Sequence, residues 1–123
     1  MTKHLTMADT MNKAMLEKNF QTLVIDIGHQ YGWKIAHFGQ SQSARGRHIT
    51  ATMADGAGYF DLTMAKGYKL VFAELKREKG TLSPRQKDWV STMKEVAKYN
   101  PHVEVYIWYP HDISDIINIL SKE

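Results

Sequence analysis

Two strand patterns separated by a very short connection place the tightest limit on the fold of this 123-residue chain. Tyr59–Met64 and Tyr68–Lys76 are both rich in aromatic, β-branched and aliphatic residues, and only Ala65-Lys66-Gly67 lies between them. A connection this short cannot cross over to make a parallel pair, so the two strands must form an antiparallel hairpin. We expect its turn at Lys66-Gly67.

The expected turn determines which side chains share a face of the hairpin. It places Asp61 opposite Phe72, which makes Asp61 a diagonal neighbour of Glu74 on the same face. Such neighbours are roughly 7–8 Å apart, a separation that one hard cation can bridge. Lys76 lies on this face as well, because side chains alternate along a strand. Two converging carboxylates repel each other without a cation, so the pattern favours a divalent-metal site.

The remaining patterns place the hairpin in an α/β fold. We expect a helix over about 12–31, a strand over 33–38, a long mobile loop over 39–57, a helix from Ser83-Pro84 to about Lys98, a strand over 103–108 and a final helix capped by Asp112. The order is helix, three strands, helix, strand, helix. It predicts a mixed sheet flanked by helices, with the last strand parallel to an earlier one. Residues 1–123 form a single domain in this interpretation, and about 1–11 are expected to be disordered.

Composition narrows the class of protein without selecting a function. The formal net charge of +3 and the pI of about 9.1 permit an anionic partner but do not require one. The chain has no cysteine, which excludes disulfides and thiolate metal sites. We see neither a signal peptide nor an apolar run long enough for a membrane span, so we expect a cytoplasmic protein with no membrane partner.

The residues around the hairpin resemble the VRR-NUC family of the PD-(D/E)XK nuclease superfamily, in particular its small stand-alone, phage-type members. The matching residues are, in order, Gly58, Asp61-Leu62, Glu74-Leu75-Lys76, Gly80, Leu82-Ser83 and Gln86, with Trp89 after them. The resemblance extends from about residue 17 to about residue 120. Phe60 replaces the proline of the superfamily motif, a position that ligates nothing. The resemblance implies a restriction-endonuclease-like core of order αβββαβ(α), in agreement with the pattern of elements.

The resemblance also implies roles for individual residues in a Mg²⁺- or Mn²⁺-dependent phosphodiesterase. The expected catalytic residues are Asp61, Glu74, Lys76 and Gln86. The expected metal ligands are Asp61, Glu74 and the backbone carbonyl of Leu75, with Glu17 on the first helix as a further candidate. Gln86 has two open interpretations, because Ser83-x-x-Gln86 is also a capping box that would begin the helix.

The expected substrate is DNA, since basic residues flank the acidic pair on both sides. The candidate DNA-binding residues are Arg45, Arg47, His48, Arg77, Lys79, Arg85 and Lys87. Nothing in the chain resembles a sequence-reading module. Small stand-alone nucleases of this type often cut branched DNA as homodimers, which favours a structure-selective endonuclease of Holliday-junction or flap type, compatible with a phage protein in a bacterial host. The alternatives are a non-catalytic nuclease-fold module that binds DNA or protein, and a nicking or restriction-type nuclease.

Overall fold

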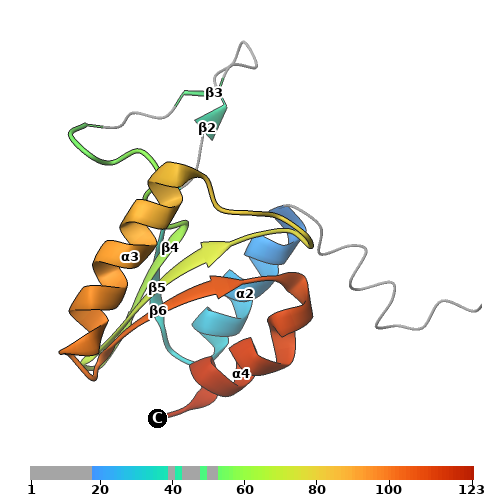
Figure 1. Ribbon diagram of the computed structural model, residues 1–123. Coiled ribbons are helices and arrows are strands. Elements are labelled where there is room, and N and C mark those ends of the chain that lie inside the picture. The colour runs from blue at the N-terminus through green and yellow to red at the C-terminus, as the bar shows by residue number, and fades with distance from the viewer. Residues whose placement is uncertain (1–17, 39–40, 43–47, 50–52) are drawn as a thin grey trace, which may run out of the picture.

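Four strands form one mixed sheet with helices on both faces (Figure 1). The computed structural model describes residues 18–38, 41–42, 48–49 and 53–123. The strand order across the sheet is β1 (Lys34–His37), β4 (Leu62–Lys66), β5 (Lys69–Leu75) and β6 (Val103–Trp108). The first two neighbouring pairs are antiparallel, whereas β5 and β6 are parallel. The expected α/β class, the mixed sheet and the parallel last strand are therefore confirmed.

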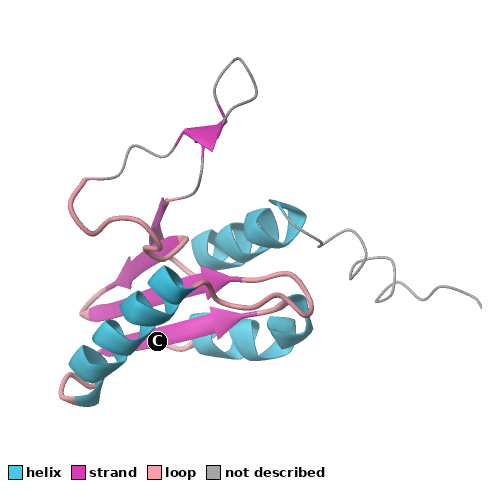
Figure 2. Cartoon of the chain, turned by 45° about the horizontal axis from the view of Figure 1, so that its top comes forward, coloured by secondary structure: helices cyan, strands magenta, loops and turns pink. Residues whose placement is uncertain are grey.

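The helices divide between the two faces of the sheet. Figure 2 shows α3 (Pro84–Lys98) on one face, and α2 (Lys18–Gln30) and α4 (Ile113–Ser121) on the other. Gly32, whose φ is +88°, follows α2 and lets the chain turn into β1. Within the part of the chain that the structure describes, no helix is both long enough and apolar enough to cross a membrane.

The side chains of the hairpin point alternately to the two faces of the sheet, and each face has its own hydrophobic core. The larger core lies against α2 and α4, and its buried side chains include Phe20, Val24, Leu62, Met64, Val71, Ala73, Ile116 and Leu120. The smaller core lies under α3 and consists of Phe60, Phe72 and Val90, with partly buried neighbours around them. Successive residues of β5 thus point to opposite cores, as the period of two requires. Glu74 therefore points to the α3 face with Phe72.

The hairpin turn is one residue later than expected. Lys66 pairs with Lys69, so the turn consists of Gly67-Tyr68 and not of Lys66-Gly67. Gly67 has a φ of +60°, the left-handed conformation that primed two-residue hairpin turns need at their first position. Glycine adopts it without a Cβ clash, which explains why the turn begins there.

The displaced turn shifts the pairing by two residues and so leaves every side chain on its expected face. The expected pairing of Asp61 with Phe72 is wrong, because Thr63 is the residue opposite Phe72. The ladder ends with Leu62 opposite Ala73. One step further along the hairpin, Asp61 comes directly opposite Glu74 instead of diagonal to it.

Two connections differ from their expected structure. The prediction of a loop throughout 39–57 is wrong at two places, because β2 (Ser41–Gln42) and β3 (His48–Ile49) pair there as a small antiparallel sheet. Strands of two residues are too short to leave a periodic pattern. A 3-10 turn, η1 (Pro110–Asp112), precedes α4, and the Asp112 carboxylate accepts a hydrogen bond from the Tyr109 backbone N–H at 2.9 Å instead of capping α4.

Some expectations concern residues beyond the described part of the chain. The expected disorder of 1–11 and the first turns of the expected helix over 12–31 fall there, as do residues 39–40, 43–47 and 50–52. The helix beginning at Ser83-Pro84 and the strand over 103–108 have the expected bounds.

Candidate functional site

Asp61 and Glu74 face each other at the open end of the β4–β5 hairpin. Asp61 lies immediately before β4, and its Oδ2 accepts a hydrogen bond from the Leu75 backbone N–H at 2.8 Å. Glu74 is only 2% exposed, whereas Asp61 remains partly exposed. The pair therefore has one buried carboxylate and one that lies at the protein surface.

The environment of Glu74 opposes a negative charge. Its Oε1 accepts a hydrogen bond from Gln86 Nε2 at 2.9 Å, but its buried Oε2 has no hydrogen-bond partner among the described residues. Burial raises the pKa of Glu74 to about 9, the neighbouring Asp61 carboxylate adds to this increase, and the Lys76 ammonium opposes it. Buried polar atoms are nearly always satisfied, so Oε2 is an acceptor that a proton or a cation would satisfy.

Gln86 satisfies both of its sequence interpretations at once. Its amide oxygen accepts hydrogen bonds from Lys76 Nζ at 2.8 Å and from the Ser83 backbone N–H at 2.9 Å. The Gln86 backbone N–H donates to Ser83 Oγ at 3.2 Å, which completes the capping box at the start of α3. Because the amide nitrogen donates to Glu74, a single side chain joins the helix cap, the lysine and the buried carboxylate.

A close backbone approach holds the segment before β4 against the start of α3. Gly58 has a φ of +83°, and a Cβ at this position would lie 2.7 Å from the Arg85 carbonyl carbon and 2.9 Å from the Gln86 nitrogen. A glycine is therefore required there both for its backbone conformation and for space. The approach positions the Asp61 segment beside the helix that carries Gln86.

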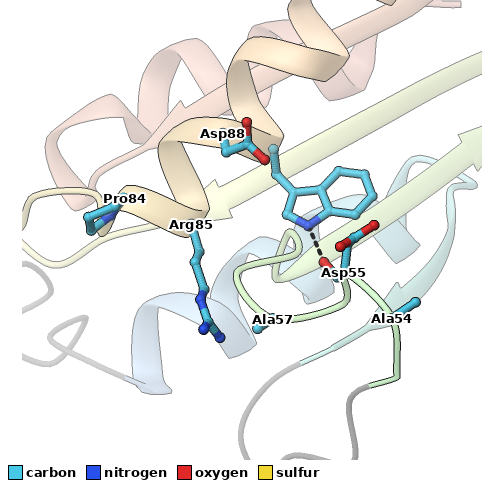
Figure 3. Close-up of a pocket in the computed structure, with 7 residues that line it drawn as sticks. Ala54, Asp55, Ala57, Pro84, Arg85 and Asp88 are labelled. Atoms are coloured by element: carbon cyan, nitrogen blue, oxygen red, sulfur yellow. Dashed lines mark hydrogen bonds between the residues drawn. The ribbon is translucent and has the colours of Figure 1, made fainter.

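A cavity of about 370 Å³ lies beside this junction, between residues 54–57 and the first turns of α3 (Figure 3). Trp89 Nε1 donates a hydrogen bond to the Asp55 backbone carbonyl at 2.8 Å and so joins the two walls. Arg85 lines the cavity together with the carboxylates of Asp55 and Asp88. The mixed charge of this lining disfavours a site for phosphate alone.

The predicted basic residues do not all come to the same place. Arg77 and Lys79 are exposed on the loop after β5, and Arg85 and Lys87 are exposed in the first turns of α3. Of the others, His48 belongs to β3, while Arg45 and Arg47 lie outside the described residues. Contact of these residues with DNA stays a prediction.

The donors at the hairpin end fit a hard divalent cation, but as a partial set. Within the described residues, no three acidic, histidine or cysteine side chains are grouped to hold a metal ion. Asp61 and Glu74 supply two carboxylates, the Leu75 backbone lies against Asp61, and Glu17 falls outside the described residues. The unpartnered Oε2 of Glu74 is the observation that favours a cation, since Mg²⁺ and Mn²⁺ prefer oxygen ligands and keep several waters.

One contact that holds the loop after β5 could not be predicted from the sequence. Glu78 bonds His111, 33 residues away, and neither residue belongs to a periodic pattern or a motif. Only the fold brings the two together, beyond the carboxyl ends of the parallel strands β5 and β6.

Comparisons of this chain with protein-family models, with curated proteins and with solved structures found no match. Its function must therefore be inferred from the site itself.

Proposed function

We propose that this protein is a divalent-metal-dependent DNA endonuclease that hydrolyses phosphodiester bonds. The observation that carries the proposal is the buried Glu74 carboxylate, which lies opposite Asp61 and near Lys76. One of its oxygens has no hydrogen-bond partner in the part of the chain that the structure describes. Ion pairing with Lys76 alone would not explain it, because Lys76 Nζ donates to Gln86 instead. The arrangement of elements is compatible with the restriction-endonuclease-like core that the VRR-NUC resemblance implies.

Asp61 and Glu74 would hold a Mg²⁺ or Mn²⁺ ion. The resemblance adds the Leu75 carbonyl and, as a further candidate, Glu17. When bound, such an ion supplies charge neutralisation at the phosphate and lowers the pKa of a coordinated water.

The side chains around this pair have separable roles in the proposed reaction. Lys76 presents a compact positive charge beside the carboxylates, where it would stabilise the negative charge that develops on the phosphate. Gln86 is a positioning residue, because its amide oxygen fixes the Lys76 ammonium and its nitrogen fixes Glu74. Asp61 is held in place by the Leu75 N–H, which donates to its Oδ2 at 2.8 Å.

We propose branched DNA as the substrate and a homodimer as the active form. Both follow from the family resemblance and from the absence of a sequence-reading module in the chain. The exposed cations Arg77, Lys79, Arg85 and Lys87 would contact phosphates, which position a duplex without reading its sequence.

The test is a cleavage assay with Mg²⁺ or Mn²⁺ on a four-way junction, a flap, a nicked duplex and a single strand. We expect Asp61→Asn and Lys76→Ala to lower the cleavage rate by at least about 100-fold, since each removes charge next to the reacting phosphate. Asp26→Asn, an exposed carboxylate on α2, and Lys94→Ala, an exposed lysine on α3, are matched controls that should retain full activity.

Two outcomes would contradict the proposal. Intact substrates with both metals would exclude a nuclease acting on these DNAs. DNA binding that survives EDTA and Asp61→Asn, with no cleavage by the unmodified protein, would instead identify a binding module.

A further inference from the structure

The loop after β5 borders an open concavity of about 500 Å³, and three of the residues that line it are cationic. Its lining residues are Leu75, Lys76, Arg77, Lys79, Gly80 and Thr81. The sequence of this loop alternates in charge, because Glu78 stands between Arg77 and Lys79. Glu78 is nevertheless absent from the lining, so the fold separates the cations from the acid.

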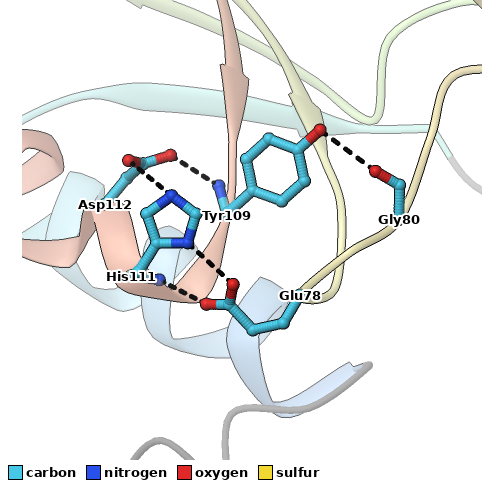
Figure 4. Close-up of polar contacts among 5 residues, drawn as sticks. All are labelled: Glu78, Gly80, Tyr109, His111 and Asp112. Carbon is cyan, nitrogen blue, oxygen red and sulfur yellow. Dashed lines mark hydrogen bonds and ion pairs between the residues drawn. The ribbon is translucent and has the colours of Figure 1, made fainter.

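Glu78 is held away from the concavity by His111 (Figure 4). One carboxylate oxygen accepts the His111 backbone N–H at 2.8 Å, and the other lies 2.7 Å from His111 Nδ1. The opposite ring nitrogen lies 3.3 Å from the Asp112 carboxylate, and the ring stacks on Tyr109 with 5.3 Å between centroids. The hydrogen bond with Glu78 raises the pKa of His111, which favours the imidazolium and so the ion pair.

The loop itself is fixed at several points. Tyr109 Oη donates to the Gly80 carbonyl at 3.1 Å (Figure 4). The Gly80 N–H donates to the Arg77 carbonyl at 2.9 Å. Lys79 has a φ of +63°, which glycine would adopt with less strain. The turn of the backbone therefore does not explain why this residue is a lysine. These contacts hold the backbone of the loop that carries Arg77 and Lys79.

We propose that this concavity, the phosphate cradle, binds a phosphate of the substrate strand next to the phosphate that is hydrolysed. Leu75 and Lys76 belong both to the cradle and to the border of the Asp61–Glu74 pair, which places the two phosphates side by side. His111 is a positioning residue in this arrangement, because it keeps the Glu78 carboxylate from pairing with the cradle cations. The inference rests on the proposed function only in taking the anion to be a nucleic-acid phosphate.

The cradle is tested by DNA binding in EDTA, measured by fluorescence anisotropy over a range of salt concentrations. We expect Lys79→Gln to weaken binding and to lower the slope of log K against log salt by about one, the change for one lost phosphate contact. Lys94→Gln makes the same charge change in α3 and should leave the slope as it is. An unchanged affinity and an unchanged slope for Lys79→Gln would overturn the cradle.

The test of the positioning role of His111 must distinguish the position of Glu78 from a general loss of structure. His111→Ala removes the ring contact with Glu78 and keeps the backbone N–H bond to its other oxygen. We expect this variant to weaken DNA binding about 3–10-fold, because the Glu78 oxygen that loses the imidazolium can then pair with Lys79. Adding Glu78→Gln should restore the affinity, since the amide carries no charge. His102→Ala, which removes an exposed histidine near the hairpin turn, is the control and should have no effect. Failure of the double variant to recover affinity would overturn the role of His111.

These results separate the cradle from the proposed nuclease activity. In EDTA no metal-dependent cleavage occurs, so affinities and salt slopes are independent of catalysis. Cleavage that fails while the Lys79→Gln effect holds would overturn the nuclease and leave the cradle in place. Cleavage that persists while Lys79→Gln has no effect on binding would do the reverse.

Discussion

At the scale of single residues, the amide of Gln86 explains why sequence alone left its role open. An amide offers an acceptor and two donors, so capping a helix and contacting a site are compatible. In the folded protein the amide oxygen accepts hydrogen bonds from the Ser83 N–H and from Lys76, while the amide nitrogen donates to Glu74. The choice between the two interpretations was never exclusive, and only the arrangement of β5 against α3 could reveal this.

Substitutions of Ser83 and Gln86, the two residues of the capping box, separate the role of Gln86 in the helix cap from its role in the site. Ser83→Ala removes the acceptor for the Gln86 N–H and should lower the free energy of unfolding by about 0.5–2 kcal/mol. Gln86→Ala should cost stability of similar size and also release Lys76 and Glu74, with a loss of cleavage rate of about 10-fold or more. Urea unfolding and single-turnover cleavage measure the two effects. Equal losses of cleavage rate in the two variants would show that Gln86 acts through the helix cap alone.

At the scale of elements, the hairpin shows which part of a register the sequence can predict. The alternation of side chains predicts correctly that Asp61 and Glu74 share a face, because a shift of the pairing by two residues leaves each side chain on the same face. The predicted turn is one residue too early, because Lys66-Gly67 and Gly67-Tyr68 both contain the glycine. The two turns differ only in whether Gly67, which has the left-handed conformation, is the second or the first turn residue. By contrast, α3 has the expected bounds because Ser83 and Pro84 are strong local start signals.

Gly58 offers a test of how the segment before β4 is positioned. Gly58→Ala adds a methyl group in a left-handed conformation and against the backbone of Arg85, so we expect the free energy of unfolding to fall by more than about 2 kcal/mol. Gly67→Ala is the matched control, because Gly67 is also left-handed but has open space around its Cβ position. It should cost only about 1 kcal/mol. Urea unfolding measures both, and equal losses would contradict the close approach.

At the scale of the whole molecule, the site exists only where three separate elements meet. Asp61 precedes β4, Glu74 belongs to β5 and Gln86 to α3, and the smaller core of Phe60, Phe72 and Val90 holds these elements together. The sequence could place the carboxylates on one face but could not predict that Glu74 is buried, because its burial depends on how α3 packs. The Glu78–His111 contact was hidden for the same reason.

The burial of Glu74 should make the stability of the metal-free protein depend on pH. Its pKa is about 9 in the folded protein, against an ordinary value of 4.5, so the folded state binds the extra proton between these limits. Stability then falls as pH rises through this range, by up to about 1.4 kcal/mol per pH unit for one proton. Glu74→Gln should remove this slope, whereas Glu95→Gln on the exposed side of α3 should keep it.

A divalent ion should reverse the effect, because it replaces the proton at Glu74. Mg²⁺ or Mn²⁺ would stabilise the folded state by mass action. We expect a larger rise in Tm at pH 8 than at pH 6, because protons compete less with the metal for the Glu74 carboxylate at the higher pH. Asp61→Asn and Glu74→Gln should both abolish the rise, and Asp26→Asn should not. A rise in Tm that is equal at both pH values, or that survives in Glu74→Gln, would place any bound metal away from this carboxylate pair.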